Sequence, residues 1–185
     1  ICFLSSEYAP LAKTGGLADV SAALPRYLHA AGHDVRVFLP LYRRVDDGKR
    51  PLQPIDSLQE ISVEIGETTH RFSVYRTSAP GSDLPIYLIF FFNDSATAEI
   101  YTQDADEHVR FLLHSHAALL ACQRMGFAPQ VIHCNDWQTG MVPLLLRTTY
   151  AWDQLFRETR TVLTIHNIGY QGVFGPHIVP DLRLG

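Results

Sequence analysis

Short apolar segments alternate with segments of helical period along most of the chain, and this alternation limits its possible folds more than any other feature. Apolar runs of this length are typical of strands, and the helical segments between them indicate crossover helices. The expected strands of this kind are residues 1–5, 34–40, 129–134 and 159–166. The pattern predicts an α/β fold with a Rossmann-like, mostly parallel sheet and flanking helices.

Between residues 58 and 92 the strands are shorter and lie closer together in the sequence. The expected strands here are residues 58–65, 70–76 and 85–92, and the first two are joined by a turn at residues 66–69. This region predicts a small antiparallel excursion inserted into the parallel sheet.

Three segments have the apolar spacing of a helix. They are residues 15–32, 104–126 and 136–151. Asp104 and Glu107 resemble a capping box at the start of the second segment, and Gly126 is the expected stop signal at its end. Asp136 is the expected N-cap of the third.

Composition and charge limit the partners of the chain. Its 185 residues and 46% hydrophobic content suit one domain with a substantial core. A formal net charge of −4 without a dense Lys/Arg block makes nucleic acid and anionic membranes unexpected partners. The sequence contains no apolar stretch of the roughly 20 residues that a membrane helix needs.

The three cysteines do not indicate a disulfide framework. Cys2, Cys122 and Cys134 are odd in number and widely separated, so neither paired disulfides nor a CxxC metal pair is expected. A reducing compartment fits this usage. Because the chain starts inside an expected strand and without an initiator Met, we expect a partial sequence.

Polar and glycine residues gather directly after three of the expected parallel strands. These clusters are "SSEYAPLAKTGG" at residues 5–16, "HCNDW" at residues 133–137 and "HNIGYQG" at residues 166–172. In an open α/β sheet, ligands bind in the crevice outside the carboxyl ends of the strands. The three clusters therefore predict one ligand site at that edge.

The first cluster suits a phosphate. Lys13 supplies a cation, and Gly15 and Gly16 stand at the mouth of a helix, where exposed N–H groups and the positive helix end favour an anion. The cluster matches neither a Walker loop nor the GxGxxG dinucleotide fingerprint. The alternative is an ordinary glycine-rich turn with a solvated lysine.

The other two clusters contain groups that can meet a ligand. Asp136 can serve as a helix cap or as a ligand contact, and His166 can offer its imidazole or its backbone carbonyl. A purely structural histidine is the alternative. His133, Cys134 and Asp136 point in diverging directions along a strand, so no metal site is expected. The sequence has no GxSxG nucleophile elbow, which argues against a hydrolase of that kind.

Taken together, the three clusters resemble a known family. This chain resembles the N-terminal domain of glycogen and starch synthases in three segments: "SSEYAPLAKTGGLADVSAALPRYLHAAGHDVRVFLPLY", "VIHCNDWQTGMVPLLLR" and "TVLTIHNIGYQGVF". These synthases are retaining glucosyltransferases of GT-B fold. The resemblance implies transfer of glucose from ADP-glucose, or less often UDP-glucose, to the 4-hydroxyl at the non-reducing end of an α-1,4-glucan.

The resemblance also implies which residues bind the donor. Lys13, Gly15 and Gly16 would meet the phosphates and sugar of the nucleotide sugar. Asp19 would line the same crevice. Neither a cofactor nor a metal ion is implied, and the other substrate would be the α-1,4-glucan acceptor.

The transferred glucose would lie beside the other two clusters. The resemblance implies that Asp136 and His166 border this sugar as catalytic residues, His166 through both its side chain and its carbonyl. Asn135, Tyr170 and Gln171 are further candidates for contacts with sugar hydroxyls.

By the same resemblance, residues 1–185 are part of the N-terminal domain, and the C-terminal nucleotide-binding domain of such enzymes is absent. The fragment is then expected to be inactive alone, in the bacterial cytoplasm or in a plastid stroma. The alternative is a non-catalytic glucan- or nucleotide-binding module.

One stretch departs from the family pattern. The family has an aromatic-Asp-Arg segment that ends in Tyr, whereas this chain reads "FFFNDSATAEIYT" at residues 90–102. This stretch also resembles the translation of a common sequencing adapter with two changes, which suggests a chimaeric read. No site residue is assigned between residues 90 and 102.

Overall fold

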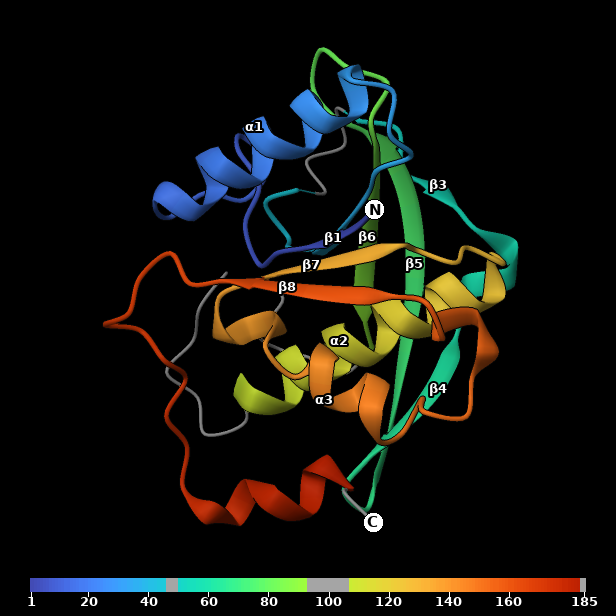
Figure 1. Ribbon diagram of the computed structural model, residues 1–185, viewed down its shortest axis with the longest axis vertical. Helices are drawn as coiled ribbons and strands as arrows, with labels where there is room; N and C mark the ends of the chain where they lie inside the picture. The colour runs from blue at the N-terminus through green and yellow to red at the C-terminus, as the bar shows by residue number, and fades with distance from the viewer. Residues whose placement is uncertain (46–49, 93–106, 184–185) are drawn as a thin grey trace.

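A computed structural model describes residues 1–45, 50–92 and 107–183. Within these residues, one sheet of eight strands has helices on both faces (Figure 1). The strand order is β3-β5-β6-β2-β1-β7-β8, and β4 lies off this path and pairs with β5. The predicted α/β class is confirmed. The strands are β1 (Cys2–Leu4), β2 (Arg36–Pro40), β3 (Gln53–Pro54), β4 (Ile61–Ile65), β5 (Thr68–Ser78), β6 (Pro85–Phe91), β7 (Val131–Asn135) and β8 (Arg160–Thr164).

The strands that position the clusters run parallel. β1 pairs in parallel with β2 and β7, and β7 pairs in parallel with β8. The register places Leu4 beside Cys134, and Asn135 beside Thr164. The carboxyl ends of β1, β7 and β8 therefore lie next to one another at one edge of the sheet.

The predicted antiparallel excursion is confirmed. Its hairpin is β4 and β5, which are joined at Gly66 and Glu67, and Gly66 has a φ of 57°. The third expected strand, β6, pairs antiparallel with β5 and also pairs in parallel with β2, so it joins the excursion to the parallel sheet. Ile86, Leu88 and Ile89 are fully buried on both faces of β6, as is usual for a strand inside an α/β sheet.

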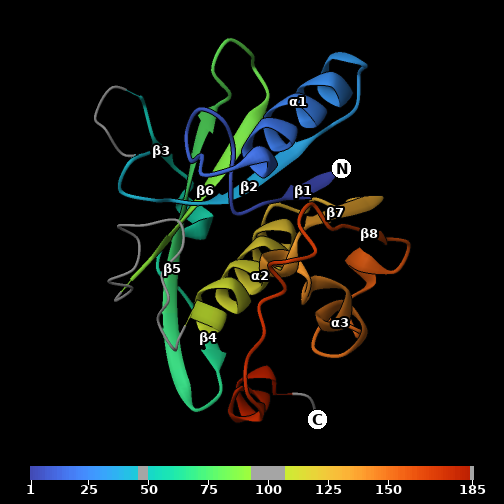
Figure 2. The same ribbon diagram turned by 90° about the vertical axis from the view of Figure 1, so that its left-hand side faces the viewer.

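Helices cover both faces of the sheet (Figure 2). α1 (Gly16–Ala30) lies on one face, and α2 (Glu107–Arg124) and α3 (Val142–Arg147) lie on the other. Side chains alternate along β1, so Phe3 belongs to the core on the α1 side and Leu4 to the core on the α2 side. Among the described helices, none is both long and apolar enough to cross a membrane.

The helix predictions hold in part. α1 runs through residues 16–30, and Gly126 follows α2 with a φ of 60° as expected. Asp104 lies outside the described residues, as do residues 93–102 of the departing stretch. The third predicted helix was wrong in extent, since a 3₁₀ turn at Trp137–Thr139 precedes the six-residue α3. The Asp136 side chain makes no capping hydrogen bond to that turn.

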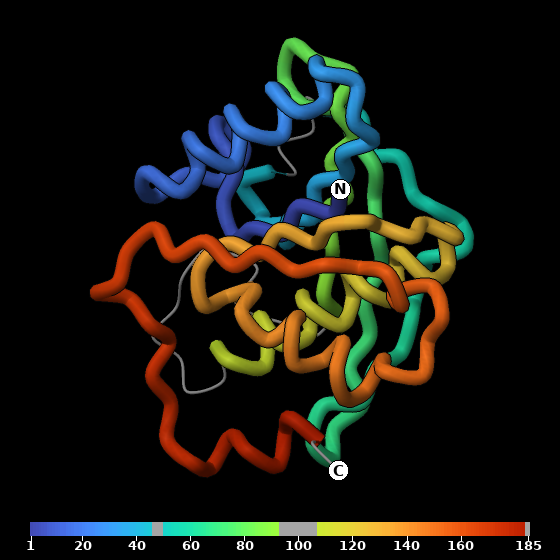
Figure 3. The backbone as a smooth tube through the Cα atoms, viewed as in Figure 1, coloured from blue at the N-terminus to red at the C-terminus, as the bar shows by residue number. Residues whose placement is uncertain are grey.

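The C-terminal segment runs away from the carboxyl ends of the strands and then returns to the β4–β5 hairpin (Figure 3). Its 3₁₀ helix, Pro176–Leu182, is held there through Asp181. The Asp181 carbonyl accepts a hydrogen bond from the Gly66 N–H at 3.3 Å, and Asp181 Oδ2 lies 2.8 Å from His108 Nε2. These contacts tie the segment to α2 and to the hairpin.

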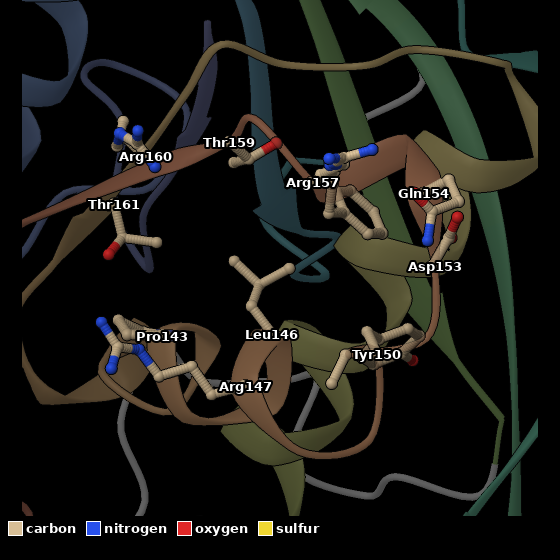
Figure 4. A pocket seen from close by; sticks show the side chains of 12 residues that line it. Pro143, Leu146, Arg147, Tyr150, Asp153, Gln154, Arg157, Thr159, Arg160 and Thr161 are labelled. Atoms are coloured by element: carbon tan, nitrogen blue, oxygen red, sulfur yellow. The ribbon is translucent and has the colours of Figure 1, made fainter.

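β8 lies at the edge of the sheet, and β7 is its partner among the described strands. Val162 is 45% exposed and Leu163 is 47% exposed, on opposite faces. Beside the strand, a pocket of about 530 Å³ lies between α3 and β8, with Leu146 and Thr161 in its wall (Figure 4). Adjacent apolar residues of this kind are typical of an interior parallel strand and unusual at an edge.

The two apolar residues of β8 differ in the direction of their backbone groups. The Thr164 carbonyl accepts a hydrogen bond from the Asp136 N–H at 2.8 Å, so Thr164 turns its backbone groups towards β7. Because this direction alternates along a strand, Val162 also faces β7 and Leu163 faces the free edge.

We expect Val162→Pro to lower the free energy of unfolding by about 1–3 kcal/mol, because it leaves a β7 carbonyl without its donor. Leu163→Pro should cost much less, since proline is tolerated where the N–H points away from the sheet. Urea unfolding of the two variants measures the difference. Equal losses would contradict this register.

Two of the three buried histidines of α2, His114 and His116, have strongly lowered pKa values. Desolvation lowers the pKa of His114 to about 3, and a smaller opposing effect comes from the Ser5 backbone. Neither ring nitrogen of His114 has a hydrogen-bond partner, so the Ser5 backbone acts on the ring without a hydrogen bond. Burial lowers the pKa of His116 to about 4, and its Nδ1 lies 3.0 Å from the Tyr150 hydroxyl. Both rings are neutral in the folded chain near neutral pH.

These rings should make the fold sensitive to acid. Above the ordinary histidine pKa, both rings are neutral in the folded and in the unfolded chain. Below it, the histidines of the unfolded chain bind protons, whereas the buried rings of the folded chain do not. We expect the free energy of unfolding to fall by about 1.4 kcal/mol per pH unit for each ring between pH 6 and pH 4.

His114→Leu should remove one ring's share of that slope, whereas the exposed control His33→Gln should keep the parent slope. Urea unfolding at several pH values between 4 and 7.5 tests this. An unchanged slope in His114→Leu would show that the buried ring is not the cause.

Candidate functional site

All three predicted clusters lie at the carboxyl ends of neighbouring parallel strands. The loop after β1, the turn after β7 and the loop after β8 leave together on the left of Figure 1, where the N-terminal end of α1 also lies. Direct contacts join them, because Asn135 reaches back to Leu4 and His166 reaches both Asn135 and Asp136. The predicted convergence of the strand ends is therefore present.

A buried carboxylate shapes the glycine turn before α1. Glu7 is 2% exposed, and its carboxylate accepts hydrogen bonds from the Thr14 N–H at 2.8 Å, the Thr14 hydroxyl at 2.6 Å and the Gly15 N–H at 3.1 Å. These bonds fix the path of the chain into the helix. Glu7 lies inside the first quoted cluster, but sequence reasoning assigned it no role. A charged residue directly after a buried strand was the available signal.

The first turn of α1 is open. Gly15 precedes the helix, and no side chain caps the exposed N–H groups. A Cβ added at Gly15 or Gly16 would meet nothing within 4 Å, so both glycines border open space. The positive helix end and these N–H groups can receive an anionic group.

Lys13 and Asp19 meet across this turn. Lys13 Nζ lies 2.6 Å from Asp19 Oδ1 and 2.8 Å from Asp19 Oδ2, and both side chains are about half exposed, at 48% and 59%. An exposed pair of this kind contributes little to stability. The lysine can therefore exchange its carboxylate partner for an anionic ligand at small cost.

Asp136 binds the neighbouring loop. Its φ is 58°, and its Oδ1 accepts a hydrogen bond from the His166 N–H at 2.6 Å. The predicted N-cap role is wrong, because the carboxylate is turned towards the backbone after β8 and away from its own 3₁₀ turn. Asp136 is buried, with 8% exposure, and its hydrogen bond to His166 joins the ends of β7 and β8.

Asn135 is fully buried between the two neighbouring strand ends. Its Nδ2 donates to the Leu4 carbonyl at 2.8 Å, and its Oδ1 lies 2.9 Å from His166 Nε2. The Thr139 hydroxyl binds the Asn135 N–H and carbonyl at 2.6 and 3.0 Å. No part of Asn135 is exposed in this structure, and its side chain joins the end of β1 to the loop after β8.

Tyr170 and Gln171 lie farther along the loop. Tyr170 is 75% exposed, and Gln171 Nε2 donates to the Ile168 carbonyl at 2.7 Å. Neither makes a hydrogen bond to the other predicted site residues among the described contacts. Gly172 has a φ of 59°, and a Cβ there would lie 2.2 Å from the Trp137 ring, so the loop packs directly on that ring. The Trp137 ring also packs edge-on against Phe111 and Phe174.

His133 lies beside this group and is neutral. Its Nε2 is 2.8 Å from the Thr164 hydroxyl, and its ring packs edge-on against Phe3 at 4.9 Å. Burial lowers the pKa of His133, and the nearby His166 lowers it further. Within the described residues, His, Cys, Asp and Glu side chains form no cluster of three that could hold a metal ion.

Comparison with known proteins identifies the family. The family described as "Starch synthase catalytic domain" matches residues 1–185. This chain belongs to that family. The sequence resemblance to glycogen and starch synthases is thereby confirmed.

Individual members of the starch synthase catalytic domain family match the whole chain. A glycogen synthase of Syntrophotalea carbinolica is 41% identical over 188 residues, which cover 100% of this chain and 38% of that protein. Glycogen synthase 2 of Geobacter sulfurreducens is 42% identical with the same coverage. This chain therefore spans less than two fifths of the length of these relatives.

A solved structure supports the same assignment. The catalytic domain of starch synthase IV from Arabidopsis thaliana, bound to ADP and acarbose, is similar with a TM-score of 0.87 and 29% identity. The match covers 100% of this chain and 37% of that one. The α/β arrangement described above is thus that of a starch synthase catalytic domain.

We expect Glu7→Gln to lower the free energy of unfolding by about 1–3 kcal/mol, because an amide nitrogen replaces one charged acceptor in the glycine turn. Amide hydrogen exchange at Thr14 and Gly15 should speed up. The exposed turn residue Glu67 offers a control, since Glu67→Gln removes the same charge without these bonds. Unchanged exchange at Thr14 would mean that Glu7 does not hold the turn.

Proposed function

We propose that this chain is the donor-facing, N-terminal part of an α-glucan synthase that transfers glucose from ADP-glucose to the non-reducing end of an α-1,4-glucan with retention. The observation that carries the proposal is the hydrogen-bonded group of Asn135, Asp136 and His166, which shares one sheet edge with the open turn at Gly15 and Gly16. Family membership supports glucosyl transfer, and the ADP in the Arabidopsis structure supports a nucleotide-containing donor.

The open end of α1 suits the diphosphate of the donor. As the bond between the glucosyl carbon and the diphosphate breaks, its electron pair leaves with the nucleotide and negative charge grows on the phosphate. Lys13, released from Asp19, and the uncapped N–H groups after Gly15 would stabilise that charge. The N–H groups are oriented before the reaction, whereas Lys13 has to exchange Asp19 for the phosphate.

The group at β7 and β8 suits the transferred sugar. Positive charge develops on the glucosyl carbon, and the His166 carbonyl would stabilise it. The hydrogen bond from the His166 N–H to Asp136 supports this role, because it fixes the backbone of that residue. Asp136 Oδ2 has no hydrogen-bond partner among the described residues and can accept from a sugar hydroxyl. The acceptor 4-oxygen then bonds to the carbon, and its proton passes to the departing diphosphate oxygen.

Transfer to a glucan also requires exclusion of water, because hydrolysis competes with transfer. The site on this chain is open, and its relatives are more than twice as long. We therefore propose that a second domain closes the cleft, carries most of the nucleotide pocket and sets the preference for ADP-glucose over UDP-glucose. The same proposal places the enzyme in a bacterial cytoplasm or a plastid stroma.

The 185-residue chain should bind ADP-glucose weakly and should not elongate glucan, because it lacks the closing domain. Lys13→Ala should weaken binding by about tenfold, as expected for one partly exposed hydrogen bond to a charged group. Isothermal titration calorimetry measures the affinity, and incorporation of labelled glucose into glycogen measures elongation.

Arg71→Ala is the matched control for binding, because Arg71 forms an exposed ion pair with Glu60 in the antiparallel part of the sheet. It should leave the affinity unchanged. Equal affinity in the Lys13 variant would remove Lys13 from the donor site. Binding without elongation, even after the chain replaces the matching part of the Syntrophotalea carbinolica synthase, would favour the non-catalytic module instead.

A further inference from the structure

The side-chain amide of Asn135 has only one workable orientation. One end of the amide lies 2.8 Å from the Leu4 carbonyl, and a carbonyl oxygen can only accept a hydrogen bond. The nitrogen of the amide must therefore face Leu4. Because Asn135 is fully buried, water cannot satisfy a reversed amide.

This orientation determines where His166 carries its proton. With the nitrogen turned to β1, Asn135 Oδ1 faces His166 Nε2 at 2.9 Å. That oxygen only accepts, so Nε2 must donate, and a neutral ring then holds its free lone pair on Nδ1. Nδ1 has no hydrogen-bond partner among the described residues, and the ring is half-buried.

We propose that Asn135 is a positioning residue that holds neutral His166 in the Nε2–H tautomer, so that Nδ1 accepts a hydrogen bond from a hydroxyl of the bound sugar. The inference rests on the proposed function for the identity of the ligand. The tautomer itself follows from the chain of hydrogen bonds through Leu4, Asn135 and His166.

Two neighbouring groups complete the surroundings of the ring. The Asp136 carboxylate accepts the His166 backbone N–H, so it fixes the main chain while Asn135 fixes the ring. His133 lies on the adjacent strand, and burial lowers its pKa, with a smaller contribution from His166. A neutral amide at position 135 orients the imidazole without adding a charge that would favour its doubly protonated form.

Thr139 provides a matched control. Its hydroxyl binds the Asn135 backbone at 2.6 and 3.0 Å, and it makes no hydrogen bond to His166 among the described contacts. Thr139→Val removes buried hydrogen bonds at the same turn and leaves the Asn135 side chain in place. A loss of stability alone therefore affects both Asn135→Ala and Thr139→Val, whereas a loss of ring orientation affects only the first.

NMR spectroscopy of the 185-residue chain with ¹⁵N-labelled histidine tests the tautomer, and His166→Gln assigns the resonances. At neutral pH the parent chain should show His166 with its proton on Nε2 and with slow exchange of that proton with water. In Asn135→Ala the slow exchange should be lost and the Nδ1–H form should appear. Thr139→Val should keep the parent pattern.

A parent spectrum with the proton on Nδ1 would overturn the proposal without any substitution. So would an Asn135→Ala spectrum identical to that of the parent. These outcomes do not depend on the enzymatic reaction.

Glucan elongation by the Syntrophotalea carbinolica chimera tests the role of the tautomer in function. Asn135→Ala should lower kcat by about 100-fold with a smaller change in KM, because a misplaced catalytic contact chiefly affects the transition state. Thr139→Val should retain most of the activity. Full activity of Asn135→Ala would overturn the positioning role. An inactive parent chimera would count against the proposed function alone, and the spectra would still decide the tautomer.

Discussion

Three neighbouring strand ends are joined by hydrogen bonds that leave few alternatives for the side chains involved. The Leu4 carbonyl at the end of β1 binds Asn135 after β7, and Asn135 and Asp136 both bind His166 after β8. The parallel register places these residues side by side, and burial makes each missing bond expensive. This part of the candidate site therefore takes its shape from the ends of the strands.

The glycine turn depends on a comparable constraint. Glu7 places a buried negative charge beneath the start of α1, where the helix dipole favours it, and uses that charge to hold Thr14 and Gly15. The buried Glu7 organises the turn, while Gly15 and Gly16 border open space. Lys13 and Asp19 form an exposed ion pair at the same turn, and a pair of this kind contributes little to stability.

Much of the sheet, and the meeting of the three polar clusters at the carboxyl ends of its strands, can be predicted from the sequence. The parallel strands and α1 follow from apolar periodicity, and the polar clusters mark the carboxyl edge because ligands bind there in open α/β sheets. The sequence around Asp136 predicts a helix cap. Its carboxylate instead accepts a hydrogen bond from the N–H of His166, which lies 30 residues later in the chain. The orientation of Asn135 and the buried role of Glu7 also depend on tertiary contacts. The parallel pairing of β6 with β2 was not predicted, because an apolar run does not reveal every strand with which it pairs.

The central claim is that the glycine turn and the group around His166 form one binding site. Titration of the ¹⁵N-labelled chain with ADP-glucose tests this most directly, with the backbone amide signals of Gly16 and His166 followed together. One site predicts that both signals shift along the same binding curve with a single Kd. A shift at Gly16 with no change at His166, or two curves with different Kd values, would contradict the account.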